Sequence, residues 1–224
     1  MSTPQSFRNE SGPAPGGAAG FACWSPDRRY RWSLRRAWPS AGPGPGLSLT
    51  FVMLNPSTAG ATRDDATIRR CRGFAEREGC GSFEVVNLFA LVSTDPRGLL
   101  ADPDPVGFAC DQVIVSACTG RDDRTVVVAW GANTGHPRLR PRALQVLELL
   151  DGHQVPCRVL GITADGHSAH PLRLHRNAPL RPGIPPAWHP EHPLRELSGL
   201  TRTAAPIAAQ GVSESPGSRA AGAA

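Results

Sequence analysis

The chain has 224 residues, a formal net charge of +5 at pH 7 and 40% hydrophobic residues, which is enough apolar material for one folded domain. All 24 of its Lys-plus-Arg residues are arginine. A P-loop lysine and a lysine Schiff base are therefore excluded, and the mild positive charge is compatible with nucleic-acid binding without requiring it.

The first strand pattern in the chain is weak. Residues Arg31–Trp38 alternate loosely between apolar and polar side chains and could add an antiparallel edge strand. Further along, four short apolar runs rich in β-branched residues predict strands: Leu47–Leu54, Phe83–Phe89, Thr125–Trp130 and Cys157–Ile162. Continuous apolarity is typical of parallel strands that are buried on both faces.

Helical patterns lie between these runs. Apolar residues recur at helical spacing in 64–79, 105–118 and 139–150, and Pro141 is compatible with the last helix only in its first turn. Strands that alternate with helices predict βαβ units. The expected fold is α/β, a three-layer sandwich in which helices flank a mostly parallel four-stranded sheet.

The ends of the chain have a different composition. Residues 1–20 and 178–224 are rich in Gly, Pro and Ala without a periodic apolar pattern, so we expect a disordered leader and a disordered tail around a single α/β domain at 21–177. The leader lacks the apolar region of a signal peptide, and no apolar run is long enough to span a membrane. We therefore expect a cytoplasmic protein without membrane contact, whose six cysteines are reduced and mostly buried.

Polar residues lie at the end of each of the four apolar runs or directly after it. In an open α/β sheet the ligand crevice lies at the carboxyl ends of the strands, so these residues are expected to meet there. The candidate ligand-binding residues are Pro56, Ser57, Thr58, Asp65, Asn87, Phe89, Trp130 and Gly131, with Asn55 and His170 as candidate catalytic residues.

Each of the main candidates has a structural alternative. Asn55 could cap the turn at Pro56, or it could orient a water or a ligand carbonyl in the crevice. Asn87 interrupts an apolar strand and could bond a neighbouring loop, or it could read the edge of a nucleobase. His170 could be a surface residue, or it could stabilise a developing anion.

The charged residues have alternatives as well. Asp64 and Asp65 fit the acidic start of a helix, with a base or a cation ligand as the other interpretation. Arg69 and Arg70 could face solvent or bind phosphate, as could the arginines at the start of the domain, which include Arg31. His167, His170 and His175 match no zinc-site spacing, and no metal or cofactor is expected.

Several ordered blocks resemble a known family. Residues 53–59 (MLNPSTA), 64–71 (DDATIRRC), 86–91 (VNLFAL), 129–131 (AWG) and 170–172 (HPL) resemble the signature of the uncharacterised family called domain of unknown function 1643. The resemblance covers about residues 25–177. The family name implies no activity.

The same blocks are more distantly similar to the uracil-DNA glycosylase superfamily. This resemblance implies that Asn55 positions the attacking water, that Asn87 reads the base and that His170 stabilises the departing base. Ser57 stands where the mismatch-specific branch prefers Gly, and Leu172 where it has Ser. These departures leave room for another ligand.

Three interpretations of the function are therefore considered, in this order. The first is a glycosylase-like domain that hydrolyses an N-glycosidic bond of a nucleobase, in DNA or in a nucleotide, without a lysine. The alternative is a non-catalytic nucleotide or nucleic-acid binding module that uses the same crevice. Another small-molecule hydrolase or transferase is the third interpretation.

Overall fold

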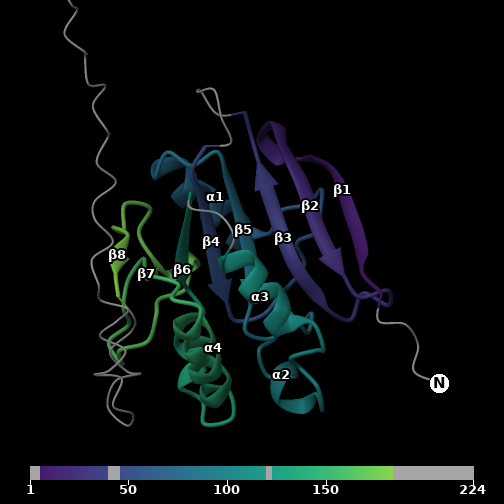
Figure 1. The fold of residues 1–224 in the computed structure, drawn as a ribbon, viewed down its shortest axis with the longest axis vertical. Coiled ribbons are helices and arrows are strands. Elements are labelled where there is room, and N and C mark those ends of the chain that lie inside the picture. Colours follow the sequence, from purple (N-terminus) through teal and green to yellow (C-terminus); the bar gives the residue numbers. More distant parts are fainter. Residues whose placement is uncertain (1–5, 40–45, 120–122, 184–224) are drawn as a thin grey trace, which may run out of the picture.

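The computed structural model describes residues 6–39, 46–119 and 123–183. Within these ranges, eight strands form one sheet in the order β1-β2-β3-β5-β4-β6-β7-β8 (Figure 1). The strands are β1 Arg8–Ala14, β2 Ala18–Trp24, β3 Arg31–Ala37, β4 Ser48–Met53, β5 Ser82–Asn87, β6 Arg124–Val128, β7 Cys157–Val159 and β8 Arg181–Pro182. The helices are α1 Ala66–Arg77, α2 Gly98–Ala101, α3 Cys110–Cys118 and α4 Arg140–Gly152, with 3₁₀ turns η1 Pro15–Gly17, η2 Ala132–Gly135 and η3 Pro171–Arg173.

The sheet is mixed, and this corrects the expected architecture. The four apolar runs form β4, β5, β6 and β7, which pair in parallel as β5-β4-β6-β7. The remaining pairings, β1–β2, β2–β3, β3–β5 and β7–β8, are antiparallel. The α/β class is therefore right, but a mostly parallel four-stranded sheet is wrong, because antiparallel strands extend the parallel centre on both sides.

The expected disordered leader is also wrong for most of its length. Residues 8–14 and 18–24 pair as the hairpin β1–β2, and the turn between them uses Gly16 and Gly17 at positive φ. The glycines that indicated disorder therefore make a tight turn. β3 lies between β2 and β5 rather than at an edge. Residues 1–5 of the leader and 184–224 of the tail lie outside the described residues.

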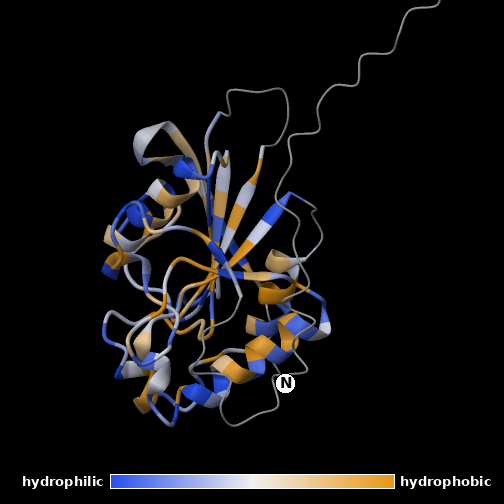
Figure 2. Cartoon of the chain, turned by 90° about the vertical axis from the view of Figure 1, so that its left-hand side faces the viewer, coloured by the Kyte–Doolittle hydropathy of each residue, from blue (hydrophilic) through white to orange (hydrophobic). Residues whose placement is uncertain are grey.

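Helices cover both faces of the sheet. On one face α1 buries Ile68, Cys71 and Phe74 against β4 and β5. On the other face α3 and α4 bury Ile114 and Val146 in a second apolar cluster. Figure 1 shows α3 and α4 in front of the sheet, and Figure 2, turned by 90°, shows the strands between helical layers. α1, α3 and α4 lie in the segments where the apolar period predicted helices, whereas α2 was not predicted.

A β-bulge in β3 changes which face its side chains occupy. Cys23 is opposite Ser33 while Trp24 is opposite Arg31, so β3 carries Trp32 as an extra residue. Trp32 belongs to the apolar cluster of α3 and α4 and stacks on Tyr30 with ring centroids 5.2 Å apart, whereas Leu34 belongs to the cluster of α1. Because of the bulge, Trp32 and Leu34 lie on opposite faces of the sheet although they are two residues apart.

Candidate functional site

A cavity of about 830 Å³ lies at the carboxyl ends of the parallel strands. Its walls come from the residues after β4, from the end of β5, from the loop after β6, from the first turn of α1 and from the segment around η3. β4 runs downward in Figure 1, so the cavity is at the lower edge of the sheet. The seven predicted residues that line it are Asn55, Ser57, Asp65, Asn87, Trp130, Gly131 and His170.

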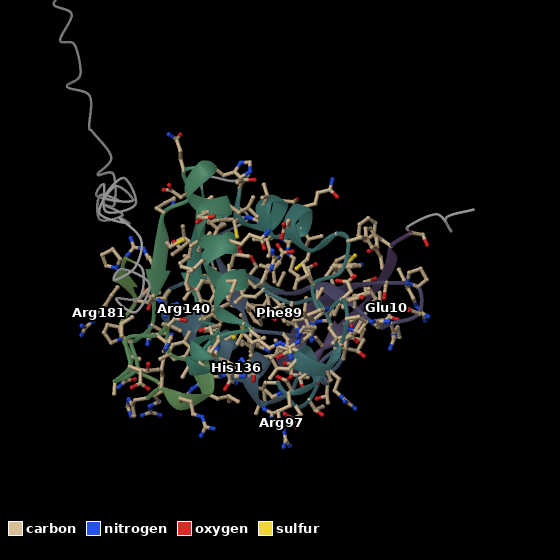
Figure 3. The ribbon with its side chains drawn as sticks, turned by 90° about the horizontal axis from the view of Figure 1, so that it is seen from below. Glu10, Phe89, Arg97, His136, Arg140 and Arg181 are labelled. Carbon is tan, nitrogen blue, oxygen red and sulfur yellow. The ribbon has the colours of Figure 1, made fainter. Side chains whose placement is uncertain are left out.

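The other predicted residues do not line this cavity. Phe89 is 3% exposed and packs in the apolar cluster of α3 and α4; it is labelled near the middle of the view in Figure 3. Thr58 is exposed, and its carbonyl accepts a hydrogen bond from Arg63. Pro56 is buried, and its carbonyl accepts from the Ser93 amide at 3.0 Å.

The two arginines predicted to bind phosphate also have other contacts. Arg69 is exposed and donates to the carbonyl of Asp64 at 3.1 Å. Arg70 donates to the carbonyls of Pro171 and Leu174. Arg70 therefore connects α1 to the η3 segment next to His170. It contributes to the position of this cavity wall without lining the cavity itself.

Asn55 is held in one orientation by its amide group. Its Nδ2 donates to the carbonyl of Pro56 at 2.9 Å and to the carbonyl of Ser93 at 2.8 Å. Both amide hydrogens are thus used by the backbone, which leaves Oδ1 as the polar atom that can face a ligand. Oδ1 is an acceptor, so Asn55 suits a water or a ligand donor and does not suit a ligand carbonyl.

Asn87 ends β5 opposite Met53 and is 3% exposed. Its Nδ2 is buried, and no described residue accepts a hydrogen bond from it. Its backbone is fixed from the other face of the sheet, because the Cys110 thiol donates to the Asn87 carbonyl at 3.2 Å. An unmatched buried donor costs about 1–3 kcal/mol, and a ligand acceptor in the cavity would remove that cost.

His170 lies against Gly131, where the chain after β6 turns. Gly131 has φ 87°, and a Cβ there would lie 3.2 Å from the His170 Cβ. Nδ1 of His170 accepts from the Leu172 amide at 3.3 Å, so the neutral ring carries its proton on Nε2. Burial lowers the pKa of His170, and the positive charge of Arg173 lowers it further, while Asp65 acts in the opposite direction. The ring is therefore a neutral hydrogen-bond donor near pH 7.

The two aspartates before α1 have different roles. Asp65 is the N-cap of α1 and accepts from the Ile68 amide at 2.8 Å, as its position predicted. It also lines the cavity. Asp64 instead forms a buried ion pair with Arg36, at 2.7 Å from Nη2 to Oδ1. Arg36 also donates to the Gly60 carbonyl at 2.7 Å, which fixes the loop that leads from Asn55 to α1.

Sequence reasoning did not single out Arg31 as a site residue. Arg31 is the first residue of β3, lines the cavity and is 3% exposed. β3 runs upward in Figure 1, antiparallel to β5, so its beginning lies at the edge where the parallel strands end. A search limited to the residues that follow strands overlooks this position.

Further polar residues line the cavity beside the predicted ones. They are Thr67, Ser93, Thr94, Asn133, Thr163 and Arg173. Thr67 is two residues after the N-cap of α1, and Ser93 and Thr94 belong to the segment that Asn55 anchors. Asn133 and Thr163 follow the predicted strands Thr125–Trp130 and Cys157–Ile162, and this position was the available signal for them.

Metal and membrane features were searched in the same ranges of the chain. Among the residues that the structure describes, no group of three or more His, Cys, Asp or Glu side chains could hold a metal ion. No described helix is long and apolar enough to cross a membrane. The six cysteines are unpaired and, apart from half-buried Cys23, buried as expected.

The family can now be stated. A family model described as a protein of unknown function, DUF1643, matches residues 31–172. The chain belongs to this family. A search of curated proteins and a search of solved structures found no match. The matched range of DUF1643 begins at Arg31 and ends at Leu172, so it includes every predicted residue of the cavity. The similarity to uracil-DNA glycosylases stays a prediction.

Proposed function

We propose that this DUF1643 protein hydrolyses the N-glycosidic bond of a nucleobase, in DNA or in a nucleotide. The observation that carries the proposal is the buried, unmatched Nδ2 of Asn87 in the cavity that Asn55 and His170 also line. A base carbonyl or ring nitrogen would accept from this amide, and a volume of about 830 Å³ is ample for a base with its sugar.

The chemistry assigns one role to each residue. Water held by Oδ1 of Asn55 attacks the anomeric carbon of the sugar. The C–N bond breaks, its electron pair leaves with the base, and the proton from water passes to the base or to solvent. His170, neutral and protonated on Nε2, donates to the negative charge that develops on the base. These roles require an acceptor, a donor and a base-reading amide, and the three side chains supply them.

The test is a single-turnover assay with purified protein. The substrates are single-stranded and duplex oligonucleotides that carry uracil, mismatched thymine, hypoxanthine or an alkylated base, together with the matching nucleoside monophosphates. Alkali cleavage reports abasic sites, and chromatography reports the free base. We expect base release by the wild-type protein and its loss in His170→Ala and Asn55→Ala.

His175→Ala is the matched control, because His175 is exposed, lies five residues further along and is not a lining residue of the cavity. Retained activity in this control together with loss in His170→Ala supports the proposal. Binding of these substrates without base release by folded wild-type protein contradicts hydrolysis and supports a non-catalytic nucleotide-binding module.

A further inference from the structure

The guanidinium of Arg31 is buried beside the cavity without an anion to neutralise it. Nη1 donates to the Ala59 carbonyl at 2.9 Å, and Nε is a buried donor that no described residue matches. No described carboxylate lies within ion-pair distance of Arg31, although the charge of Asp65 is near enough to act on its pKa. Burial lowers the pKa of Arg31 to about 10, so the group stays positive at neutral pH.

Two other buried arginines provide the comparison. Arg36 is 0% exposed and pairs with Asp64, and Arg142 is 6% exposed and pairs with Asp111. Buried charges are normally paired, because an isolated charge loses its hydration without compensation. Arg31 departs from this rule, and among these three side chains it is also the one that lines the cavity.

The walls around the cavity suit an anion that accepts several hydrogen bonds. Ser57 and Thr67 contribute hydroxyl groups, and Arg173 contributes a second positive charge. The first turn of α1 reaches the cavity through Thr67, and a helix N-terminus favours negative charge. The Asp65 carboxylate opposes this preference, but it is a single charge against Arg31 and Arg173.

We propose that Arg31 binds a phosphate group, so that the ligand of this cavity is a base-bearing compound with a phosphate rather than a free base or a nucleoside. A guanidinium fork matches phosphate oxygens, and a phosphate would supply the missing acceptor for Nε. The identity of the base rests on the proposed function, whereas phosphate binding does not. A nucleoside monophosphate and a nucleic-acid strand both carry this group.

The experiment is isothermal titration of the full chain at constant ionic strength. The probes are inorganic phosphate, a nucleoside, its 5′-monophosphate and a short oligonucleotide with the same base. The variants are Arg31→Gln and Arg31→Lys, and Arg97→Gln is the control for the loss of one charge. Arg97 projects outward in Figure 3, is 88% exposed and pairs with Asp95, next to the cavity residue Pro96.

We expect the wild-type protein to bind the monophosphate about tenfold more tightly than the nucleoside. A charge-assisted hydrogen bond contributes more free energy than a tenfold difference in affinity requires. Arg31→Gln should abolish this preference, Arg31→Lys should keep part of it, and Arg97→Gln should keep all of it. An oligonucleotide that binds more tightly than the monophosphate, with the same loss in Arg31→Gln, assigns the phosphate to a strand.

Equal binding of nucleoside and monophosphate by the wild-type protein overturns the proposal, as does a phosphate preference that survives in folded Arg31→Gln. If Arg31→Gln fails to fold, the proposal is still tested by two measurements. These are the affinities of the wild-type protein for monophosphate and nucleoside, and the same two affinities of Arg31→Lys. Phosphate binding without base release would refute hydrolysis while it supports the role of Arg31. Base release at equal rates from nucleoside and monophosphate would support hydrolysis while it refutes the role of Arg31.

Discussion

Arg36 on β3 and Asp64 in front of α1 form an ion pair in the interior of the protein, with Nη2 2.7 Å from Oδ1 and side chains that are 0% and 2% exposed. A second bond joins Nε to the same carboxylate oxygen at 2.9 Å. The pair connects an antiparallel strand to the loop that carries Asn55. Its partners are 28 residues apart, so this contact helps to fix one wall of the cavity.

Arg36→Met should destabilise the protein strongly. The substitution leaves the Asp64 carboxylate buried without its cation, and breaking a buried pair in this way costs about 3–5 kcal/mol of unfolding free energy. Urea denaturation measures the loss. Arg97→Gln, which removes an exposed pair, should leave the transition midpoint unchanged. A midpoint for Arg36→Met equal to that of the wild-type protein would contradict the assigned role.

Asn55→Asp should lower both stability and activity. Asp has no amide hydrogens, so a carboxylate would face the carbonyls of Pro56 and Ser93, which accept from Asn55 at 2.9 and 2.8 Å. The loss of two hydrogen bonds is expected to cost about 1–3 kcal/mol. Thermal unfolding and the single-turnover assay measure the two effects. Normal stability in the Asp variant would show that the amide does not anchor the Ser93 segment.

His170 should make the protein less stable in mild acid. Its pKa is lowered in the folded state from the ordinary value of 6.5, so the unfolded chain binds the proton first as pH falls. The stability contribution is therefore present above pH 6.5 and is lost as pH falls through the folded-state pKa. His167, whose pKa burial also lowers, acts in the same direction.

The unfolding free energy can be measured by urea denaturation from about one unit above to about one unit below pH 6.5. It should depend less steeply on pH in His170→Gln than in the wild-type protein. Identical pH dependence of stability in both proteins would mean that His170 titrates as a solvent-exposed histidine.

The six thiols should differ in reactivity. Burial raises the pKa of Cys80 and Cys110 to about 11 and of Cys157 to about 12, which keeps these groups protonated and unreactive. Cys23 is the half-buried thiol. Alkylation of the native protein should modify Cys23 first, and mass spectrometry should find all six sites modified only in denaturant. Rapid native modification of Cys110 would contradict the rigid support of Asn87 from α3.

The parallel centre of the fold was predictable, and the antiparallel strands were not. β4 and β5 are continuous apolar runs because both faces are buried by helices. In β2, by contrast, buried residues alternate with more exposed ones, and Ala18, Ala22 and Trp24 are buried. Most of its residues are too small to give a clear apolar pattern in the sequence. Gly20 illustrates the cause, since a Cβ at this position would overlap the carbonyl of Ala61. Close backbone contact selects Gly and Ala, which in the sequence resemble a linker.

The residues of the candidate site also differ in whether the sequence could predict them. Asn55, Asn87 and His170 were predictable because each ends or follows a strand of the parallel centre, and the carboxyl ends of such strands share one edge. Arg31 required knowledge of the direction of β3, and that direction depends on its pairing with β5. Long-range pairing determines which residue of an antiparallel strand reaches the cavity, and local sequence patterns do not contain it.

Asp65→Asn should tighten phosphate binding. Asn is an equally good N-cap, so α1 keeps its hydrogen bond to the Ile68 amide while the cavity loses a negative charge. The charge of Asp65 raises the pKa values of both Arg31 and His170, which places it close to each of them. Without it, a bound phosphate meets the positive charge of Arg31 with less repulsion.

Titration with the nucleoside monophosphate measures the gain, and Asp65→Ala separates it from the helix cap. Asp65→Ala should also bind phosphate more tightly, yet lose about 1 kcal/mol of stability that Asp65→Asn retains. Weaker phosphate binding in both variants would mean that Asp65 orients the ligand rather than repels it. The anion site would then depend on an Arg31–Asp65 pair and not on Arg31 alone.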